Sequence, residues 1–403
     1  MTDTVSSLRL ERPGPLARFI ERTGQRWLAR DFDGALDVTL TSGRTLRLGH
    51  AGTPAAAHVT FRSYRVVQRS IARASIGFAE SYMDGDVEVD DLVGLFRFFL
   101  KNRPGLSEAG RGLFRVRLPD RLFHWRRANS KRGSKKNIAH HYDLGNAFYR
   151  LWLDPSMTYS SALFGPGTED LSAAQAAKYD RVLELLGMPR DARLLEIGCG
   201  WGGMARRAAR AGLSVEGITL SREQLQWAQD ANADLGQRTQ FAFRDYRDTT
   251  GTYDGVVSIE MIEAVGEEHW GTYFRTVADR LKPGGRAVIQ AITMEPSRFR
   301  HYRRKVDFIQ RYVFPGGMLL TAPAIAAEAE KAGLTLTAAE TFGESYARTL
   351  SIWRERFEAN WPEIRELGFD ERFRRLWRYY LAYCEAGFLE GAIDVGLYRL
   401  EKR

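Results

Sequence analysis

The stretch at residues 194–203, Leu-Leu-Glu-Ile-Gly-Cys-Gly-Trp-Gly-Gly, constrains the fold of this 403-residue chain more than any other. Its apolar beginning predicts a buried strand, and its glycine cluster predicts a tight turn into a helix. Gly198, Gly200 and Gly203 match the pattern G-x-G-x-x-G of nucleotide-binding turns. Glycines in such a turn let a ligand lie against bare peptide groups at the carboxyl end of a strand. The stretch therefore predicts a nucleotide-type site.

Two features of the neighbouring sequence favour S-adenosylmethionine as the ligand of this turn. Glu196 stands two residues before the first glycine, where a carboxylate can meet a cationic ligand. The next predicted strand, over residues 213–221, ends without the acidic residue that binds the ribose in dinucleotide sites. A nicotinamide dinucleotide and a purely structural glycine turn are the two alternatives.

Predicted strands and helices alternate through the second half of the chain. This alternation is typical of an α/β fold, a doubly wound and mostly parallel sheet that binds ligands at its strand ends. Residues 351–388 are rich in aromatic side chains and are expected to be helical. The predicted strands are 193–197, 214–219, 239–244, 253–259 and 285–292, and the predicted helices are 173–186, 204–211, 222–235, 268–281 and 323–332.

The first hundred residues predict a separate, small α/β domain. No catalytic constellation stands out there, so we expect a docking role. The chain is long enough for two domains, and we divide it into an accessory lipid-docking domain (1–101), a basic linker (102–136) and a larger domain (137–403). Within the accessory domain, we expect helices at 16–30, 71–83 and 90–101, a hairpin over 35–48 with its turn at 41–44, and a strand at 58–64.

Positive charge is concentrated in residues 101–136. Twelve lysine and arginine residues stand there against two acidic ones, so the segment carries +10 and the rest of the chain sums to −1. An anionic lipid surface attracts such a segment by roughly 1 kcal/mol per charge. The interleaved apolar side chains, including Leu118, Phe123 and Trp125, suit an interfacial segment. Nucleic acid and a merely solvated linker are the alternatives.

Other features of the composition limit the class of protein and its location. Two cysteines, Cys199 and Cys384, are too few for a disulfide framework. The first residues lack the basic and apolar regions of a signal peptide, and no run of about 18 apolar residues occurs. We therefore expect a cytoplasmic protein, peripheral on the inner membrane face, with no metal site.

Several motifs occur in an order that resembles the cyclopropane-fatty-acyl-phospholipid synthases and the related mycolic-acid methyltransferases. The resemblance covers residues 137–395, and the N-terminal part is more weakly similar to the accessory domain of the bacterial synthases. The motifs lie at residues 141–146, 152–155, 157–161, 196–203, 217–224, 244–248, 260–266 and 314–317.

The resemblance implies a Rossmann-like class I methyltransferase domain that transfers a methyl group from S-adenosylmethionine to the cis double bond of a phospholipid acyl chain. The alkene attacks the sulfonium methyl group, a carbocation forms, and loss of a proton from that methyl group closes a cyclopropane ring. The residues that match the family's cofactor site are Tyr159, Ser160, Glu196, Gly198, Gly200, Thr219, Leu220, Gln224, Asp245 and Tyr246.

The resemblance also implies a base site, and this chain departs from the family there. Glu263 matches a residue that holds a bicarbonate ion as the base, and Tyr346 matches a tyrosine at the same ion. Ser161 stands where the family often has cysteine, and Ala264 and Gln290 stand where it has histidines. We expect Glu263, Tyr346, Gln290 and Ser161 to be catalytic, and Glu260 and Glu263 could share a helical face. The departures leave a methylene-branched, methyl-branched or furan-precursor product open beside the cyclopropane.

Aromatic side chains of the C-terminal half are expected to line the acyl slot. A second hypothesis is methylation of a soluble amine, and a third is a lipid-binding protein with an inactive methyltransferase domain. A nucleic-acid methyltransferase is disfavoured, because no motif for a flipped base is present. The resemblance implies a homodimer. The acyl-slot candidates are Phe308, Tyr312, Phe314, Trp353, Phe357, Trp377, Tyr380 and Phe388.

We predict that neutralising several arginines between Arg111 and Lys136 weakens binding to anionic liposomes, because each charge contributes to the attraction. The difference from the unaltered protein should be larger at low salt, where screening is weak. Sedimentation with liposomes at two ionic strengths measures this. Unchanged sedimentation would contradict a membrane role for the segment.

Overall fold

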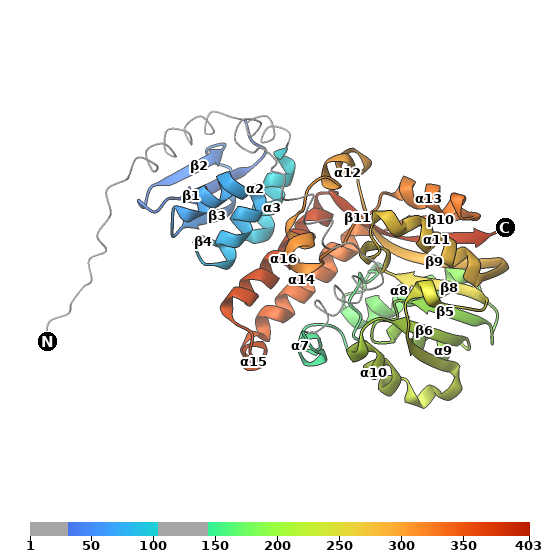
Figure 1. Cartoon of the computed structure of the whole chain (residues 1–403). Coiled ribbons are helices and arrows are strands. Elements are labelled where there is room, and N and C mark those ends of the chain that lie inside the picture. Colours follow the sequence, from blue (N-terminus) through green and yellow to red (C-terminus); the bar gives the residue numbers. More distant parts are fainter. Residues whose placement is uncertain (1–30, 104–143) are drawn as a thin grey trace. The chain divides into compact units, whose positions relative to one another are not determined.

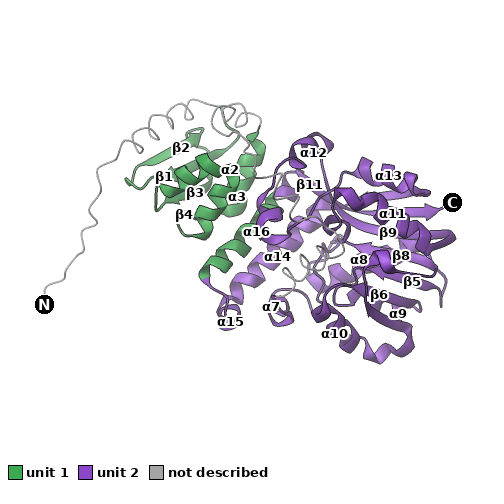
Figure 2. Cartoon of the chain, in the orientation of Figure 1, with its two compact units in different colours: residues 1–115, 371–386 green, residues 116–370, 387–403 purple. Residues whose placement is uncertain are grey.

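A computed structural model describes residues 31–103 and 144–403 (Figure 1). Contacts divide the chain into two compact units, residues 1–115 with 371–386 and residues 116–370 with 387–403 (Figure 2). The helix expected at 16–30 and most of the basic segment lie outside the described residues. Among the described residues, no helix is both long and apolar enough to cross a bilayer.

The first unit is built on a four-stranded sheet of order β2-β1-β3-β4. β1 (Ala35–Thr39) and β2 (Thr45–Gly49) form the predicted antiparallel hairpin. β3 (Ala55–Phe61) runs parallel to β1 and antiparallel to β4 (Val87–Val89), a short strand that the sequence analysis missed. The expectation for β3 was three residues too late, because residues 62–64 leave the sheet and lead into a helix.

Three helices complete the first unit: α2 (Arg65–Met83), α3 (Leu92–Lys101) and α16 (Glu371–Leu389) up to its residue 386. Asp91 caps α3 by accepting a hydrogen bond from the backbone N–H of Gly94. Within the unit, Arg375 of α16 pairs with Glu88 at 2.8 Å, and the rings of Phe96 and Tyr379 meet edge to face. A helix near the C-terminus therefore belongs to the same unit as the N-terminal sheet.

The second unit contains a seven-stranded sheet of order β10-β11-β9-β8-β5-β6-β7. Its five parallel strands are those that the sequence predicted, which confirms the α/β fold with a mostly parallel sheet. Two antiparallel strands, β11 and β10, extend the sheet beyond β9 and were not predicted. The strands are β5 (Arg193–Ile197), β6 (Ser214–Thr219), β7 (Thr239–Phe243), β8 (Tyr253–Ile259), β9 (Leu281–Met294), β10 (Leu334–Thr341) and β11 (Ile393–Lys402).

Helices cover both faces of this sheet. Successive residues of β5 show this, since they belong to different core clusters. Leu195 packs in one cluster with residues of α11 (Trp270–Arg280) and α13 (Ala322–Lys331). Leu194 packs in the other with residues of α8 (Leu171–Leu186) and α9 (Gly203–Arg210). A sheet that is buried on both faces can offer a ligand only its ends.

The C-terminal segment forms three helices where the sequence analysis expected one helical stretch. They are α14 (Gly343–Ala359), α15 (Trp361–Glu366) and α16, and Pro362 sits in the first turn of α15, where a missing N–H is tolerated. The remaining described helices of the unit are α7 (Asn146–Arg150), α10 (Arg222–Ala231) and α12 (Pro296–Tyr302), with a π-helical turn at Ile309–Val313.

We predict that Gly94→Ala destabilises the first unit, because an added Cβ would lie only 1.9 Å from the carbonyl oxygen of Ala56 on β3. The clash is between the helix and the backbone of β3, so relieving it requires α3 to shift away from the sheet, and the cost should be about 2 kcal/mol or more. Thermal unfolding followed by circular dichroism measures the loss. Arg97→Ala, at an exposed position of the same helix, is the control and should change little.

Candidate active site

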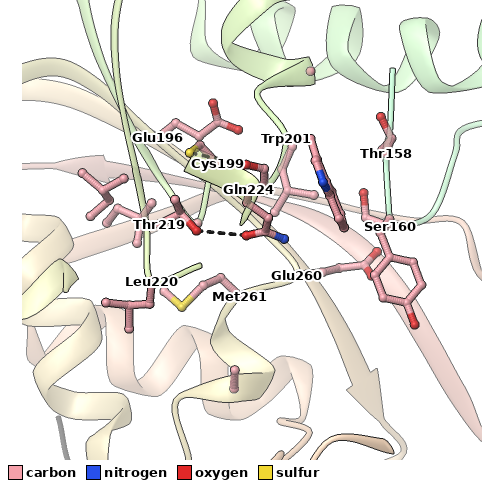
Figure 3. A pocket seen from close by; sticks show the side chains of 18 of the residues that line it. Thr158, Ser160, Glu196, Cys199, Trp201, Thr219, Leu220, Gln224, Glu260 and Met261 are labelled. Atoms are coloured by element: carbon pink, nitrogen blue, oxygen red, sulfur yellow. Dashed lines mark hydrogen bonds between the residues drawn. The ribbon is translucent and has the colours of Figure 1, made fainter. Parts of the chain in front are cut away.

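A pocket opens at the carboxyl ends of three neighbouring parallel strands (Figure 3). Ile197, Thr219 and Ile259, which end β5, β6 and β8, all line it. The chain builds the sheet outward from β5 through β6 to β7 and then returns to place β8 on the other side of β5. Such a switch point is where open α/β sheets bind ligands.

The glycine turn after β5 forms one wall of the pocket. Gly198 and Gly200 have φ values of 83° and 51°, in the left-handed region that glycine adopts without strain. A Cβ on Gly198 would lie 2.8 Å from Cγ of Met261. The turn therefore needs glycine at position 198 for both its conformation and its packing.

Nine of the ten predicted cofactor residues line this pocket. Asp245 is the exception: it is buried, and its carboxylate accepts hydrogen bonds from Nε and Nη2 of Arg247 at 2.8 and 2.7 Å. It also caps the short helical turn Tyr246–Asp248. The nine residues are Tyr159, Ser160, Glu196, Gly198, Gly200, Thr219, Leu220, Gln224 and Tyr246.

Thr219 and Gln224 are joined directly across the start of α10. The hydroxyl of Thr219 donates to Oε1 of Gln224 at 2.9 Å, the dashed line in Figure 3. Ser221 caps the helix between them by accepting from the backbone N–H of Gln224. The strand end and the helix start therefore form one fixed polar edge of the pocket.

The segment carrying Tyr159 and Ser160 is held by α8. Gln175 donates to the carbonyl oxygen of Ser160 at 2.9 Å, and Nζ of Lys178 donates to its hydroxyl at 2.7 Å. Lys178 is fully buried, and this burial lowers its pKa to about 8. The sequence analysis did not identify Lys178, although a lysine on the apolar face of a helix is a signal for a buried function.

Glu196 places an unusual carboxyl group in the pocket. It is 2% exposed, and its Oε2 has no hydrogen-bond partner among the described residues. Burial raises its pKa to about 8, while Lys178 and the backbone of Ala205 oppose the shift. A buried carboxyl oxygen without a partner favours a ligand that brings a cation or a hydrogen-bond donor.

Three of the four predicted catalytic residues converge on Glu260 rather than on Glu263. Oε1 of Glu260 accepts from the backbone N–H of Ser161 at 2.9 Å and from Nε2 of Gln290 at 2.7 Å. Oε2 accepts from the hydroxyl of Tyr346 at 2.7 Å. Glu260 lines the pocket, and its side chain extends toward Ser160 in Figure 3. The sequence analysis named Glu260 only as a neighbour of Glu263.

Glu263 lies in a different environment. Its Oε1 accepts from the backbone N–H of Ile292 at 2.6 Å, and it does not belong to the pocket lining. The expectation of a shared helical face was wrong, because Glu260 has a φ of 48° and precedes the short turn Ile262–Ala264 that carries Glu263.

The surroundings of Glu260 and Glu263 affect the pKa values of the two carboxyl groups differently. Burial raises the pKa of Glu260, but Tyr346, the amide of Ser161 and two further partners, Lys178 and Gln290, oppose that rise. Burial and the neighbouring Glu260 raise the pKa of Glu263 to about 8, and only backbone N–H groups, those of Ile292 and of Glu263 itself, oppose that rise. Hydrogen bonds that are donated to a carboxylate stabilise its ionised form. Glu260 accepts more of them from side chains, so of the two residues it is the more readily ionised.

Aromatic rings surround Tyr159 and Tyr346. The ring of Tyr159 lies 5.4 Å from Trp353 and 6.5 Å from Phe314, and Tyr346 stacks on Phe388 at 4.5 Å. These three partners were among the predicted acyl-slot residues. Of the other candidates, Phe308 and Tyr312 contact each other, and Phe357 packs on Phe148 and Trp361. Trp377 and Tyr380 belong to the first unit. The full acyl slot remains a prediction.

Comparison with known proteins identifies relatives that share this site region. The profile of the family described as mycolic acid cyclopropane synthetase matches residues 129–397. The tuberculostearic acid methyltransferase UfaA1 of Mycobacterium tuberculosis is 38% identical over 95% of this chain and 91% of its own. The cyclopropane-fatty-acyl-phospholipid synthase of Escherichia coli K12 is 36% identical over 83% of this chain and 84% of its own.

Two solved structures of cyclopropane synthases match about two thirds of the chain. The cyclopropane synthase MmaA2 from Mycobacterium tuberculosis and the mycolic acid cyclopropane synthase CmaA1 complexed with SAH and CTAB each superpose with a TM-score of 0.63. Both are 31% identical, and the match covers 66% of this chain and 98% of theirs. A coclaurine N-methyltransferase at 18% identity and a TM-score of 0.60 shares the fold alone.

We predict that the affinity for S-adenosylmethionine, the ligand that the sequence predicts for this pocket, rises with pH up to about 8. Below its raised pKa of about 8 the empty site holds Glu196 protonated, so a cation must displace a proton to bind. The affinity should change by at most about tenfold per pH unit. Calorimetric titration between pH 6 and 9 measures this, and Glu196→Gln should flatten the profile. A flat profile for the unaltered protein would contradict the assignment.

Proposed function

Because the chain belongs to the mycolic acid cyclopropane synthetase family, we propose that it methylates the cis double bond of an unsaturated phospholipid acyl chain. Members of this family are S-adenosylmethionine-dependent methyltransferases that modify lipids, and this chain is one of them. The observation that carries the proposal is the pocket at the ends of β5, β6 and β8, where predicted cofactor residues and the carboxylate of Glu260 line one space.

The described residues fit S-adenosylmethionine. The unpartnered oxygen of Glu196 suits a cationic ligand, and the bare turn at Gly198 and Gly200 admits close contact with peptide groups. Thr219 and Gln224 offer a polar edge for hydroxyl groups. When bound, the cofactor supplies a methyl group on a sulfonium ion, which is electrophilic enough to react with an alkene.

The residues beside the pocket are suited to a reaction through a carbocation. Tyr159 lines the pocket, and its ring lies against those of Trp353 and Phe314, so this aromatic wall is suited to a cation held away from water. The carboxylate of Glu260 places negative charge at the same wall. An alkene is a poor nucleophile, so positioning in a dry slot must supply much of the rate.

A bicarbonate base, which the family resemblance implies, does not fit the donors of this site. The hydroxyl of Tyr346, the amide of Ser161 and the side chain of Gln290 all donate to Glu260. The amide of Ile292 donates to Glu263. The side-chain hydroxyl of Ser161 donates to the carbonyl of Ala162, so Ser161 acts at this site through its backbone.

We propose ring closure to a cyclopropane as the fate of the carbocation. The second candidate is a methylene- or methyl-branched chain, or a furan precursor, formed after a hydride shift. A specific observation favours this second product: the relative that aligns over 95% of the chain is named a tuberculostearic acid methyltransferase. Gln290 and Ala264, where the resemblance implies histidines, are consistent with either fate.

We also propose that the enzyme works as a peripheral protein on the cytoplasmic face of an anionic membrane, as a homodimer. The basic segment of residues 101–136 supports the membrane contact, and the N-terminal unit is the proposed docking domain. The dimer follows from the family resemblance alone.

The proposal predicts label in lipid when the protein is incubated with S-adenosylmethionine carrying a trideuterated methyl group and liposomes of cis-monounsaturated phospholipid. If the lost proton comes from the transferred methyl group, the acyl chain gains a carbon that keeps two deuterium atoms. Fragmentation of the released fatty acids by mass spectrometry separates a ring from a branch. Unlabelled lipid with demonstrated cofactor binding would overturn lipid methylation and favour a soluble acceptor.

A further inference from the structure

We propose that Glu260 is the general base of this reaction: its carboxylate, built into the chain, removes the proton from the transferred methyl group. This inference rests on the proposed function and replaces a diffusible anion with a side chain. It follows from three observations about Glu260: its hydrogen-bond donors, its backbone conformation and its place in the pocket.

The donors hold the carboxylate in one orientation. Ser161, Gln290 and Tyr346 come from three separate segments, and the last two side chains are buried. Oε1 accepts two hydrogen bonds and Oε2 accepts the one from Tyr346 at 2.7 Å. A carboxylate oxygen can accept two hydrogen bonds, so Oε2 keeps a lone pair for a proton. The hydrogen bonds therefore fix the orientation of the carboxylate and leave a lone pair of Oε2 available to accept a proton.

The backbone of Glu260 is strained in a way that aims its side chain. Its φ of 48° lies in the left-handed region, which costs a residue with a Cβ roughly 1–2 kcal/mol. In the described residues only Ala74, Met157 and Asp191 share this feature among non-glycine residues. The backbone N–H of Glu260 donates to the carbonyl of Gln290 at 2.8 Å, so Gln290 holds both its main chain and its side chain. Strain of this kind is typical of functional positions.

The position of Glu260 distinguishes it from the other acidic residues of the region. Glu260 lines the pocket together with Tyr159, Ser160 and Met261, whereas Glu263 does not. Glu196 lines the same pocket at the end of β5, beside the glycine turn. The pocket therefore holds two carboxyl groups to which we assign separate tasks: Glu196, beside the glycine turn, is placed to meet a cationic ligand, and Glu260 is held by the hydroxyl of Tyr346.

In the proposed step, every bond that forms is matched by one that breaks. Methylation of the alkene forms one carbon–carbon bond, breaks the carbon–sulfur bond and leaves a cation on the neighbouring chain carbon. Glu260 then takes a proton from the new methyl group, and the electrons of that carbon–hydrogen bond close the ring onto the cation. If a hydride first shifts so that the cation lies on the carbon that bears the new methyl group, the same proton transfer gives a C=CH2 methylene branch on the open chain. Glu260 becomes neutral and returns its proton to solvent after the product leaves.

The first test compares Glu260→Gln with Glu268→Gln, an exposed position on the same connection that serves as the matched control. Loss of a positioned base should reduce formation of the lipid product by about 10²- to 10⁴-fold. Binding of S-adenosylmethionine, measured by calorimetry, should remain within about threefold, and the control should keep full activity. If Glu260→Gln retains turnover while Glu263→Gln abolishes it, Glu263 is the base and the inference falls.

The second test asks whether the base belongs to the protein. The unaltered enzyme should be equally active in buffer depleted of bicarbonate and in buffer supplemented with it. Glu260→Gly should fold, because glycine adopts the left-handed conformation without strain. This variant should be inactive alone, and added bicarbonate or formate should restore activity by entering the vacated space between the amide of Ser161 and the hydroxyl of Tyr346.

The outcomes separate this inference from the proposed function. Bicarbonate dependence of the unaltered enzyme, or full activity of Glu260→Gly without an added anion, would overturn the assignment while lipid methylation stands. An unaltered enzyme that labels no lipid would overturn the proposed function and the base assignment together. Bicarbonate-independent turnover of the unaltered enzyme, with anion rescue of Glu260→Gly only, supports the inference.

Discussion

The hydrogen bonds to the carboxylate of Glu260 connect parts of the second unit that are far apart in sequence. They join the connection after β8 to the segment before α8, to the middle of β9 and to the first turns of α14. A carboxylate in a pocket walled by aromatic rings is stable only with such donors, because burial without them strongly disfavours the charged form. The same donors tie three segments of the second unit together, so the contacts that would orient the proposed base also stabilise the fold.

Local patterns were enough to predict the elements that surround the cofactor pocket. The apolar run of β5 and its glycine turn encode a strand, a turn and a ligand site within ten residues, and the alternation that follows predicts the parallel sheet. β10 and β11 were missed for a physical reason. β10 is an edge strand with only one buried residue, Leu334, and β11 interrupts its apolar residues with glycine and charged side chains. Their pairing is a long-range property that no short window contains.

In the candidate site, too, some features could be predicted from the sequence and others could not. Nine of the residues predicted from motif positions to bind the cofactor line one pocket, but the motifs could not show which carboxylate receives the hydrogen bonds of Tyr346 and Gln290. That outcome depends on the left-handed backbone of Glu260, which turns its side chain into the pocket while Glu263, three residues later, meets the backbone of Ile292. For Asp245 the motif position was misleading. Its carboxylate accepts a hydrogen bond from Arg247, two residues later in the same turn, and it does not line the pocket.

The membership of α16 in the first unit has a consequence for how the chain is made. The first unit obtains Arg375 and Tyr379 as partners of Glu88 and Phe96 only after residues 116–370, which belong to the other unit, have been synthesised. Domains usually fold as units during synthesis, with the N-terminal one first. Here the unit that begins first cannot be completed until most of the other unit has been made, so its synthesis is interrupted by that of its neighbour.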